Sequence, residues 1–172
     1  MDYAAAILSR LPGTSPRRSK DLRQLLETLE SYLTEEQVGL VVKAYEFGAA
    51  AHEGQTRLSG EPYITHPVAV AQTLADMHLD SQTIIAAILH DVVEDTDASL
   101  EQLEEHFGAE VAQLVDGVSK LDQIQFTSRA EAQAKSFRKM MPVSYTHLRA
   151  HETERLISYA VFCLKKGGGG GG

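Results

Sequence analysis

Apolar residues recur at helical spacing through most of the chain, and this periodicity limits the possible fold more than any other feature. From Asp21 onward, one stripe of a predicted helix carries Leu22, Leu25, Leu26, Leu29 and Leu33. No segment shows the sustained alternation with β-branched residues that is typical of half-buried strands. We therefore expect an all-α fold, a bundle of helices without a sheet.

Capping and breaking residues divide this pattern into separate helices. Thr34 with Gln37, and Ser99 with Gln102, form capping-box patterns at two helix starts, and Gly108 is expected to stop the helix that follows Ser99. Glycines and prolines predict a loop over residues 53–67, in which His66 occupies the turn before a helix that opens at Pro67. The predicted helices after Thr34 span residues 35–49, 68–77 (opened by Pro67), 82–94 (capped by Asp80 or Ser81), 100–107, 111–121 and 128–141.

A chain of 172 residues fits one domain, with residues 1–20 as a flexible lead-in and 21–141 as the helical domain. No apolar run approaches the roughly 18 residues needed to cross a bilayer, and Met1–Arg10 lacks the features of an export signal. The only cysteine is Cys163, so residues 1–141 have no disulfide framework. We expect a cytoplasmic protein without membrane contact.

The charge balance excludes one class of partner. Residues 1–141 carry 12 basic and 22 acidic side chains, a net charge of −10. A general DNA-binding surface needs clustered lysine and arginine to displace counterions from phosphates, so we expect no DNA partner. A phosphate ester remains a possible substrate, because a bound divalent cation can reverse the local field in an acidic site.

One stretch, His90-Asp91-Val92-Val93-Glu94-Asp95, gathers metal-ligand and acid/base side chains. On a continuous helix His90, Asp91, Glu94 and Asp95 share an arc of roughly 140°, opposite Ile85, Ile88 and Val92. This geometry permits a shared metal site. The spacing alone favours a simpler interpretation, the solvated face of an amphipathic helix.

Several stretches around this one resemble the N-terminal hydrolase domain of the RelA/SpoT family. The similarity extends over roughly residues 20–141, far more than one short motif, so chance agreement is improbable. The stretches that carry it are Ala51–Arg57, Ser59–Pro67, Leu89–Thr96, Gly117–Leu121 and Ala132–Met140.

The resemblance implies an HD-type helical fold and a reaction of the stringent response. This reaction removes the 3′-pyrophosphate from guanosine tetra- or pentaphosphate and gives GDP or GTP. It also implies Mn²⁺ as cofactor, with His66, His90 and Asp91 as ligands, a nitrogen and oxygen set that suits this ion. The cation would polarise phosphate oxygens and help to generate hydroxide from water. Glu94 and Asp95 match the family's acidic pair, which positions or deprotonates the attacking water.

By the same resemblance Arg57 lines the nucleotide site, where a guanidinium stacks on the purine or pairs with phosphate. Lys120 is a second candidate for substrate binding, with an exposed surface position as the alternative. His66 could instead only cap a helix, and Arg57 could form a surface salt bridge with Glu61. His52, His78 and His106 are assigned to surface or packing.

The resemblance ends at Pro142. The family continues to a Lys-Leu-Ala-Asp-Arg-like segment, whose aspartate is the fourth metal ligand, and to an asparagine near the nucleotide. Residues 142–153 instead look like a translated sequencing adapter, and Gly167–Gly172 is a glycine run. We expect residues 142–172 to be a non-native tail, the bundle to be incomplete at its C-terminus and this fragment to be impaired. The alternative is a genuine linker with a short helix over residues 156–164.

Two other functions are consistent with the same residues. An HD-type phosphohydrolase acting on another nucleotide would use the same helix chemistry. A non-catalytic module that senses a nucleotide would need only part of the site, and the missing fourth ligand favours it for this fragment.

Overall fold

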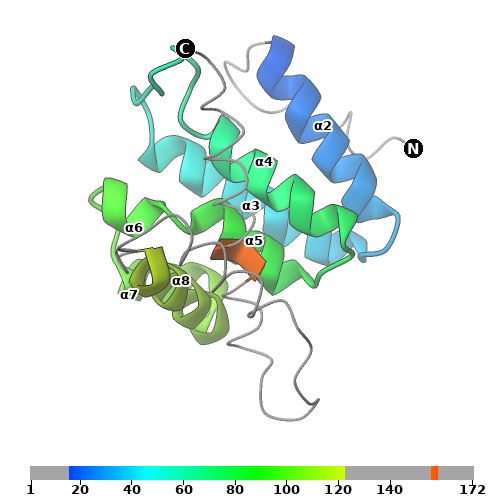
Figure 1. Ribbon diagram of the computed structural model, residues 1–172. Helices are drawn as coiled ribbons and strands as arrows, with labels where there is room; N and C mark the ends of the chain where they lie inside the picture. Colours follow the sequence, from blue (N-terminus) through cyan, green and yellow to red (C-terminus); the bar gives the residue numbers. More distant parts are fainter. Residues whose placement is uncertain (1–15, 123–155, 159–172) are drawn as a thin grey trace, which may run out of the picture.

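The computed structural model describes residues 16–122 and 156–158, and every named element in these ranges is a helix (Figure 1). One isolated bridge, Thr56 with Pro62, is the only β pairing within the described residues. The predicted all-α class is confirmed. The helices are α2 (Pro16–Glu30), α3 (Glu35–Ala51), α4 (Thr65–Asp76), α5 (Ser81–Leu89), α6 (Val92–Asp95), α7 (Leu100–Phe107) and α8 (Ala109–Asp122).

Both predicted capping boxes are confirmed. The Gln37 backbone N–H donates to Thr34 Oγ1 at 3.3 Å, and the Thr34 N–H donates to Gln37 Oε1 at 3.0 Å. Ser99 and Gln102 make the same pair of bonds at 3.3 and 3.0 Å. Gly108 follows α7 with a φ of 93°, a conformation that favours glycine and ends the helix. These boundaries depend only on contacts three or four residues apart, so the local sequence is enough to predict them.

Helices α2, α4 and α8 begin earlier than the sequence predicted, and α8 starts at Ala109 rather than at residue 111. Helix α2 starts at Pro16, within the expected lead-in, and ends at Glu30. Helix α4 starts at Thr65, so the prediction that His66 precedes the helix is wrong and His66 lies in its first turn. The His66 N–H donates to the Tyr63 carbonyl at 3.1 Å, which already turns the chain before Pro67. Proline is tolerated there because N–H groups of a first turn have no partner within the helix.

The predicted continuous helix over residues 82–94 is also wrong. Helix α5 ends at Leu89, His90 and Asp91 form a turn, and α6 is a separate helix of four residues. Asp91 has φ −93° and ψ −9°, near the bridge region where turn residues lie. Because of this break, His90 and Asp91 are buried whereas Glu94 and Asp95 are exposed. The four side chains therefore do not share one helical face.

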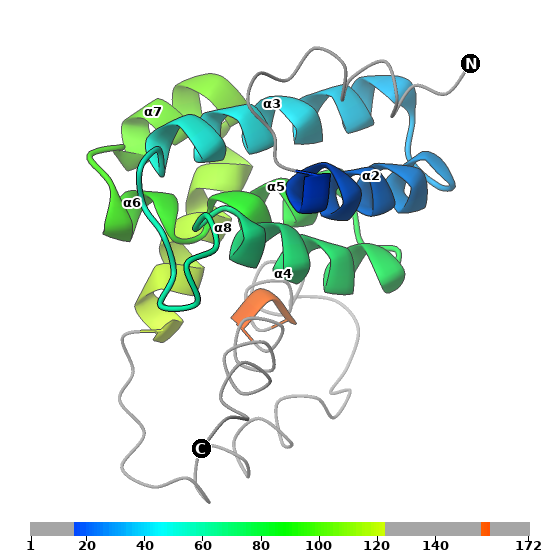
Figure 2. The same cartoon turned by 90° about the horizontal axis from the view of Figure 1, so that it is seen from above.

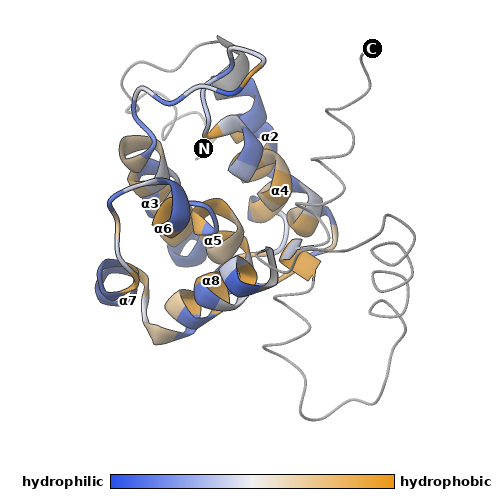
Figure 3. Ribbon diagram, turned by 60° about the vertical axis from the view of Figure 1, so that its left-hand side comes forward, coloured by the Kyte–Doolittle hydropathy of each residue, from blue (hydrophilic) through white to orange (hydrophobic). Residues whose placement is uncertain are grey.

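Helix α5 is the centre of the bundle and packs against α3, α4 and α8, while α2 packs on α4 and α7 on α8 (Figures 1 and 2). All residues from Thr83 to Leu89 are buried, as expected for a helix surrounded by others. The outer helices α4 and α8 carry both hydrophobic and hydrophilic turns (Figure 3). The central position of α5 fixes the place of His90, which follows directly after it.

The core predicts a large cost for truncating α5. Ile88 is fully buried, and its side chain lies close to Gly48 of α3. We expect Ile88→Ala to lower the free energy of unfolding by about 2–5 kcal/mol, because buried methyl groups are lost and a cavity remains. The matched control is Leu40→Ala on α3, whose side chain is 42% exposed and should cost much less. Urea unfolding of both variants measures the difference, and equal costs would contradict the central role of α5.

The described part of the chain also includes a short piece beyond Asp122. Ile157 is fully buried and belongs to the same core cluster as the helices, and Leu156 packs against that cluster. The predicted helix over residues 128–141 and the rest of the segment 142–172 lie outside the described residues. None of the helices within the described ranges combines the length and apolar character that crossing a bilayer requires.

Candidate metal centre

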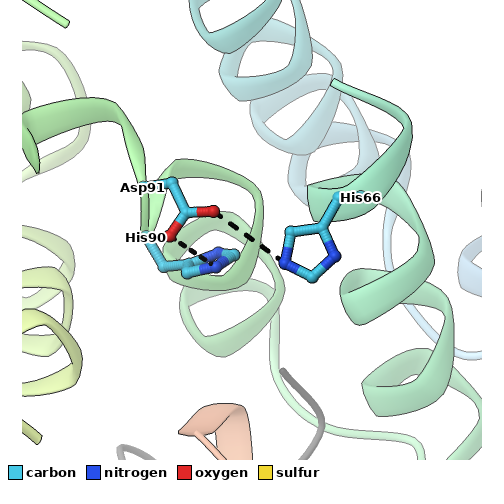
Figure 4. Close-up of side chains that lie close together, drawn as sticks. All are labelled: His66, His90 and Asp91. Carbon is cyan, nitrogen blue, oxygen red and sulfur yellow. Dashed lines mark ion pairs between the residues drawn. The ribbon is translucent and has the colours of Figure 1, made fainter. Parts of the chain in front are cut away.

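His66, His90 and Asp91 come together where α4 packs against α5. His66 projects from the first turn of α4, and His90 and Asp91 occupy the turn that ends α5. Contact between the two helices brings side chains 24 positions apart in the sequence into one cluster. Figure 4 shows the two imidazoles and the carboxylate pointing toward one another. The grouping that the resemblance implied for the metal ligands is therefore present in space.

The cluster is tight and buried. The ligand atoms of the three residues all lie within 4.8 Å of one another. His90 Nε2 is 2.9 Å from Asp91 Oδ1, and His66 Nε2 is 3.9 Å from Asp91 Oδ2. The residues are 5%, 3% and 6% exposed, in sequence order. Atoms bound to one ion at about 2.0–2.2 Å lie at most roughly 4.4 Å apart, so small side-chain movements suffice to bind a cation.

The hydrogen bond of the other His90 nitrogen fits a ligand role. His90 Nδ1 is 2.6 Å from the Ala87 carbonyl, which can only accept, so Nδ1 carries a hydrogen. In the neutral ring Nε2 is then the nitrogen with the lone pair, and it faces Asp91. A backbone carbonyl that fixes the tautomer in this way is the usual support of a metal-binding histidine. Without a cation, the 2.9 Å contact with Asp91 requires a second hydrogen on Nε2.

The Asp91 carboxylate is held in its charged form. Burial acts to raise the pKa of Asp91, but hydrogen bonds from His90 and Tyr63 and the charge of the two histidines outweigh it. The pKa is therefore well below its usual range. A carboxylate that stays ionised while buried is in the form that binds a cation.

Glu94 and Asp95 belong to the separate helix α6 and are not part of this cluster. Asp95 is linked to it by one side chain: the Tyr63 hydroxyl is 2.8 Å from Asp95 Oδ2 and 2.9 Å from Asp91 Oδ2. Glu94 is exposed. Any role of these two carboxylates in activating water stays a prediction.

The two predicted substrate residues lie on different parts of the fold. Arg57 sits in the loop between α3 and α4, where its N–H donates to the Glu61 carbonyl at 2.8 Å. Lys120 lies near the end of α8 with a 70% exposed side chain and forms an ion pair with Asp116 one turn earlier. Nothing in these contacts connects either residue to the cluster, so both assignments stay predictions.

Three residues that surround the site were not among the predicted site residues. Tyr63 contacts both carboxylates, His52 stacks on Tyr63 with ring centroids 4.6 Å apart, and Gln55 donates to the Asp95 carbonyl at 2.9 Å. His52 was assigned to surface or packing and is indeed packed, being 3% exposed. His78 and His106 are exposed. The sequence feature that could have pointed to Tyr63 was its position in the predicted loop over residues 53–67, three residues before His66.

Comparison with known proteins agrees with the resemblance found in the sequence. A sequence profile of the family described as HD domain matches residues 44–150, more than half of the chain. A guanosine-3′,5′-bis(diphosphate) 3′-pyrophosphohydrolase of Vibrio cholerae is 57% identical over 117 residues, and that of Haemophilus influenzae is 64% identical over 91. The bifunctional (p)ppGpp synthase/hydrolase SpoT of Escherichia coli is 53% identical over 130 residues.

The matches cover much of this chain but little of its relatives. They include 68%, 53% and 76% of the chain, in the order given, and only 17%, 13% and 18% of the relatives. Among solved structures, that of a metazoan SpoT orthologue aligns with 76% of this chain and 96% of its own. The TM-score is 0.47 and the identity 23%, too low to carry a conclusion.

Proposed function

The chain belongs to the HD-domain family and, within it, to the SpoT/RelA-type hydrolase domains, and from this we propose that it is part of a (p)ppGpp 3′-pyrophosphohydrolase. The observation that carries the proposal is the buried convergence of His66, His90 and Asp91. The names of relatives with 53–64% identity indicate the substrate, guanosine tetra- or pentaphosphate.

In this proposal His66, His90 and Asp91 hold a divalent cation, and Mn²⁺ is the ion that we infer. Two imidazole nitrogens and one carboxylate suit Mn²⁺ without excluding neighbouring metals. The cation supplies Lewis acidity toward phosphate oxygens. The chain prepares the ligands for it: the Ala87 carbonyl fixes the His90 tautomer, and burial keeps competing water from the three side chains.

In the proposed reaction, Glu94 and Asp95 position or deprotonate the attacking water. The water oxygen forms a bond to phosphorus, the bond from phosphorus to the 3′ oxygen breaks, and pyrophosphate leaves. One proton of the water passes to a carboxylate, and the 3′ oxygen takes up a proton. Their exposure supports this role, since a base that meets substrate cannot be fully covered.

Arg57 and Lys120 are the proposed substrate contacts. Arg57 is partly exposed in an ordered loop, so its guanidinium is accessible to a purine or a phosphate. Lys120 already pairs with Asp116 and would have to leave this pair to reach a phosphate. An exposed ion pair of this kind stabilises by at most about 1 kcal/mol, so Lys120 can leave Asp116 for a phosphate at small cost.

We also infer the setting of this reaction. The absence of cysteine from residues 1–141 is consistent with a reducing cytoplasm. We assign the hydrolase domain to residues 21–141, with α2 beginning slightly earlier at Pro16. We treat residues 142–172 as non-native on the basis of their adapter-like sequence and terminal glycine run, even though Ile157 packs in the core. Restoring the family's own segment after Met141 is therefore part of the test.

The test measures pyrophosphate released from guanosine tetraphosphate in the presence of Mn²⁺. Two proteins are compared: the chain as printed, and a version in which the Escherichia coli relative's sequence replaces residues 142–172. We expect the second to release pyrophosphate faster, because it regains the family's fourth ligand. A folded second protein that releases none would contradict the proposal.

A substrate panel separates this reaction from related ones. Faster consumption of a deoxynucleotide or a cyclic dinucleotide would identify an HD-type phosphohydrolase with another substrate. Calorimetry that shows guanosine tetraphosphate binding without metal and without turnover would identify a sensing module instead.

A further inference from the structure

We propose that Tyr63 is a positioning residue of this site, whose hydroxyl fixes the orientation of the Asp91 carboxylate toward the two histidines and its distance from Asp95. The inference rests on the proposed function for the roles of Asp91 and Asp95. The sequence predicts no role for Tyr63.

The hydroxyl of Tyr63 stands between the two carboxylates. Its oxygen is 2.9 Å from Asp91 Oδ2 and 2.8 Å from Asp95 Oδ2. The Asp91 oxygen that it contacts is also the one facing His66, 3.9 Å from His66 Nε2. The other Asp91 oxygen contacts His90 at 2.9 Å. Tyr63 and His90 thus hold one oxygen each, and together they prevent rotation of the carboxylate.

The phenol ring of Tyr63 is itself held by neighbouring side chains. His52 stacks on it at 4.6 Å, and His52 Nδ1 lies 2.9 Å from Gln55 Oε1. Gln55 Nε2 donates to the Asp95 carbonyl at 2.9 Å, and the Tyr63 N–H donates to the Gln55 carbonyl at 3.1 Å. The loop that carries Tyr63 is therefore fastened to α6, and the ring cannot move without breaking these contacts.

A hydroxyl group has one hydrogen, whereas two carboxylate oxygens accept from it here. The hydroxyl is within hydrogen-bond distance of both Asp91 and Asp95, so it links the two carboxylates.

Supporting hydrogen bonds of this kind matter for metal affinity. Removing the partner of a metal ligand typically costs about 10–100-fold in metal affinity or activity. Without the hydroxyl, only His90 would restrain Asp91, and the oxygen facing His66 would lose its donor. We therefore expect a cation to bind more weakly, even when all three ligands are intact.

The test compares Tyr63→Phe with Tyr32→Phe in the full chain. Tyr32 is a matched control, because it also stacks on a histidine, His78 at 4.7 Å, and donates one hydrogen bond, to the Leu79 carbonyl at 2.9 Å. Titration with Mn²⁺ alone, followed by the electron paramagnetic resonance signal of the unbound ion, gives the dissociation constant. We expect Tyr63→Phe to weaken binding by about 10-fold or more and Tyr32→Phe to leave it unchanged.

A second variant and a second assay complete the design. Gln55→Leu removes the bond to the Asp95 carbonyl and should weaken Mn²⁺ binding in the same direction, by less. Circular dichroism establishes that each variant is folded. Unchanged Mn²⁺ affinity in Tyr63→Phe would overturn the inference, as would equal weakening in Tyr32→Phe.

If the proposed function is wrong, the hydrolysis and Mn²⁺-binding assays give a different combination of results. If no protein releases pyrophosphate but Tyr63→Phe still binds Mn²⁺ more weakly than Tyr32→Phe, the positioning role stands and the substrate assignment fails. If Tyr63→Phe loses hydrolysis at unchanged Mn²⁺ affinity, the hydrolase assignment stands and the positioning role is wrong.

Discussion

Asp91→Asn is expected to weaken Mn²⁺ binding by more than about 100-fold and to abolish pyrophosphate release. Removing a residue that only supports a metal ligand typically lowers metal affinity by about 10–100-fold. The loss of a charged ligand should lower it further. The amide keeps the size of the side chain but removes the negative charge that faces both histidines. Its oxygen and nitrogen also cannot both accept from His90 and Tyr63.

The control for this substitution is Asp76→Asn at the other end of α4. Asp76 is exposed and accepts a hydrogen bond from Gln72, four residues earlier. It should retain normal Mn²⁺ affinity, and the same resonance titration compares the two variants. Normal Mn²⁺ affinity in folded Asp91→Asn would remove Asp91 from the ligand set.

Asp95→Asn is expected to slow pyrophosphate release by about 10²–10⁴-fold, the contribution typical of a general base. Mn²⁺ affinity should stay close to normal, because the amide oxygen can still accept from the Tyr63 hydroxyl, 2.8 Å from Asp95 in the structure. This combination, a slower reaction with the ion still bound, distinguishes a water-activating role from a ligand role. Single-turnover assays in saturating Mn²⁺ measure the rate.

Two further variants make this result specific. Glu94→Gln tests the other carboxylate, and the larger loss identifies which of the two takes the proton. Asp97→Asn is the control, since Asp97 is exposed and only two positions further along the chain. A normal rate in both Asp95→Asn and Glu94→Gln would exclude the acidic pair from catalysis.

The proposed metal ligands illustrate how sequence and structure contribute to the site. Helical spacing around His90 permitted a metal site but by itself favoured the solvated face of an amphipathic helix. The resemblance selected His66, His90 and Asp91, and the structure places these three together within 4.8 Å. Helical spacing does not connect His66 with His90, because their contact depends on how α4 packs on α5.

The sequence by itself determined the helical class, both capping boxes and the stop at Gly108, because these features depend on neighbours within one or two turns. Tertiary structure alone decided the break at His90 and Asp91 and the contacts of Tyr63. Periodicity assumes one continuous helix axis, so it cannot reveal a turn that buries two of four polar residues. The Tyr63 contacts span 28 and 32 residues, and they depend on the path of a loop that no local pattern specifies.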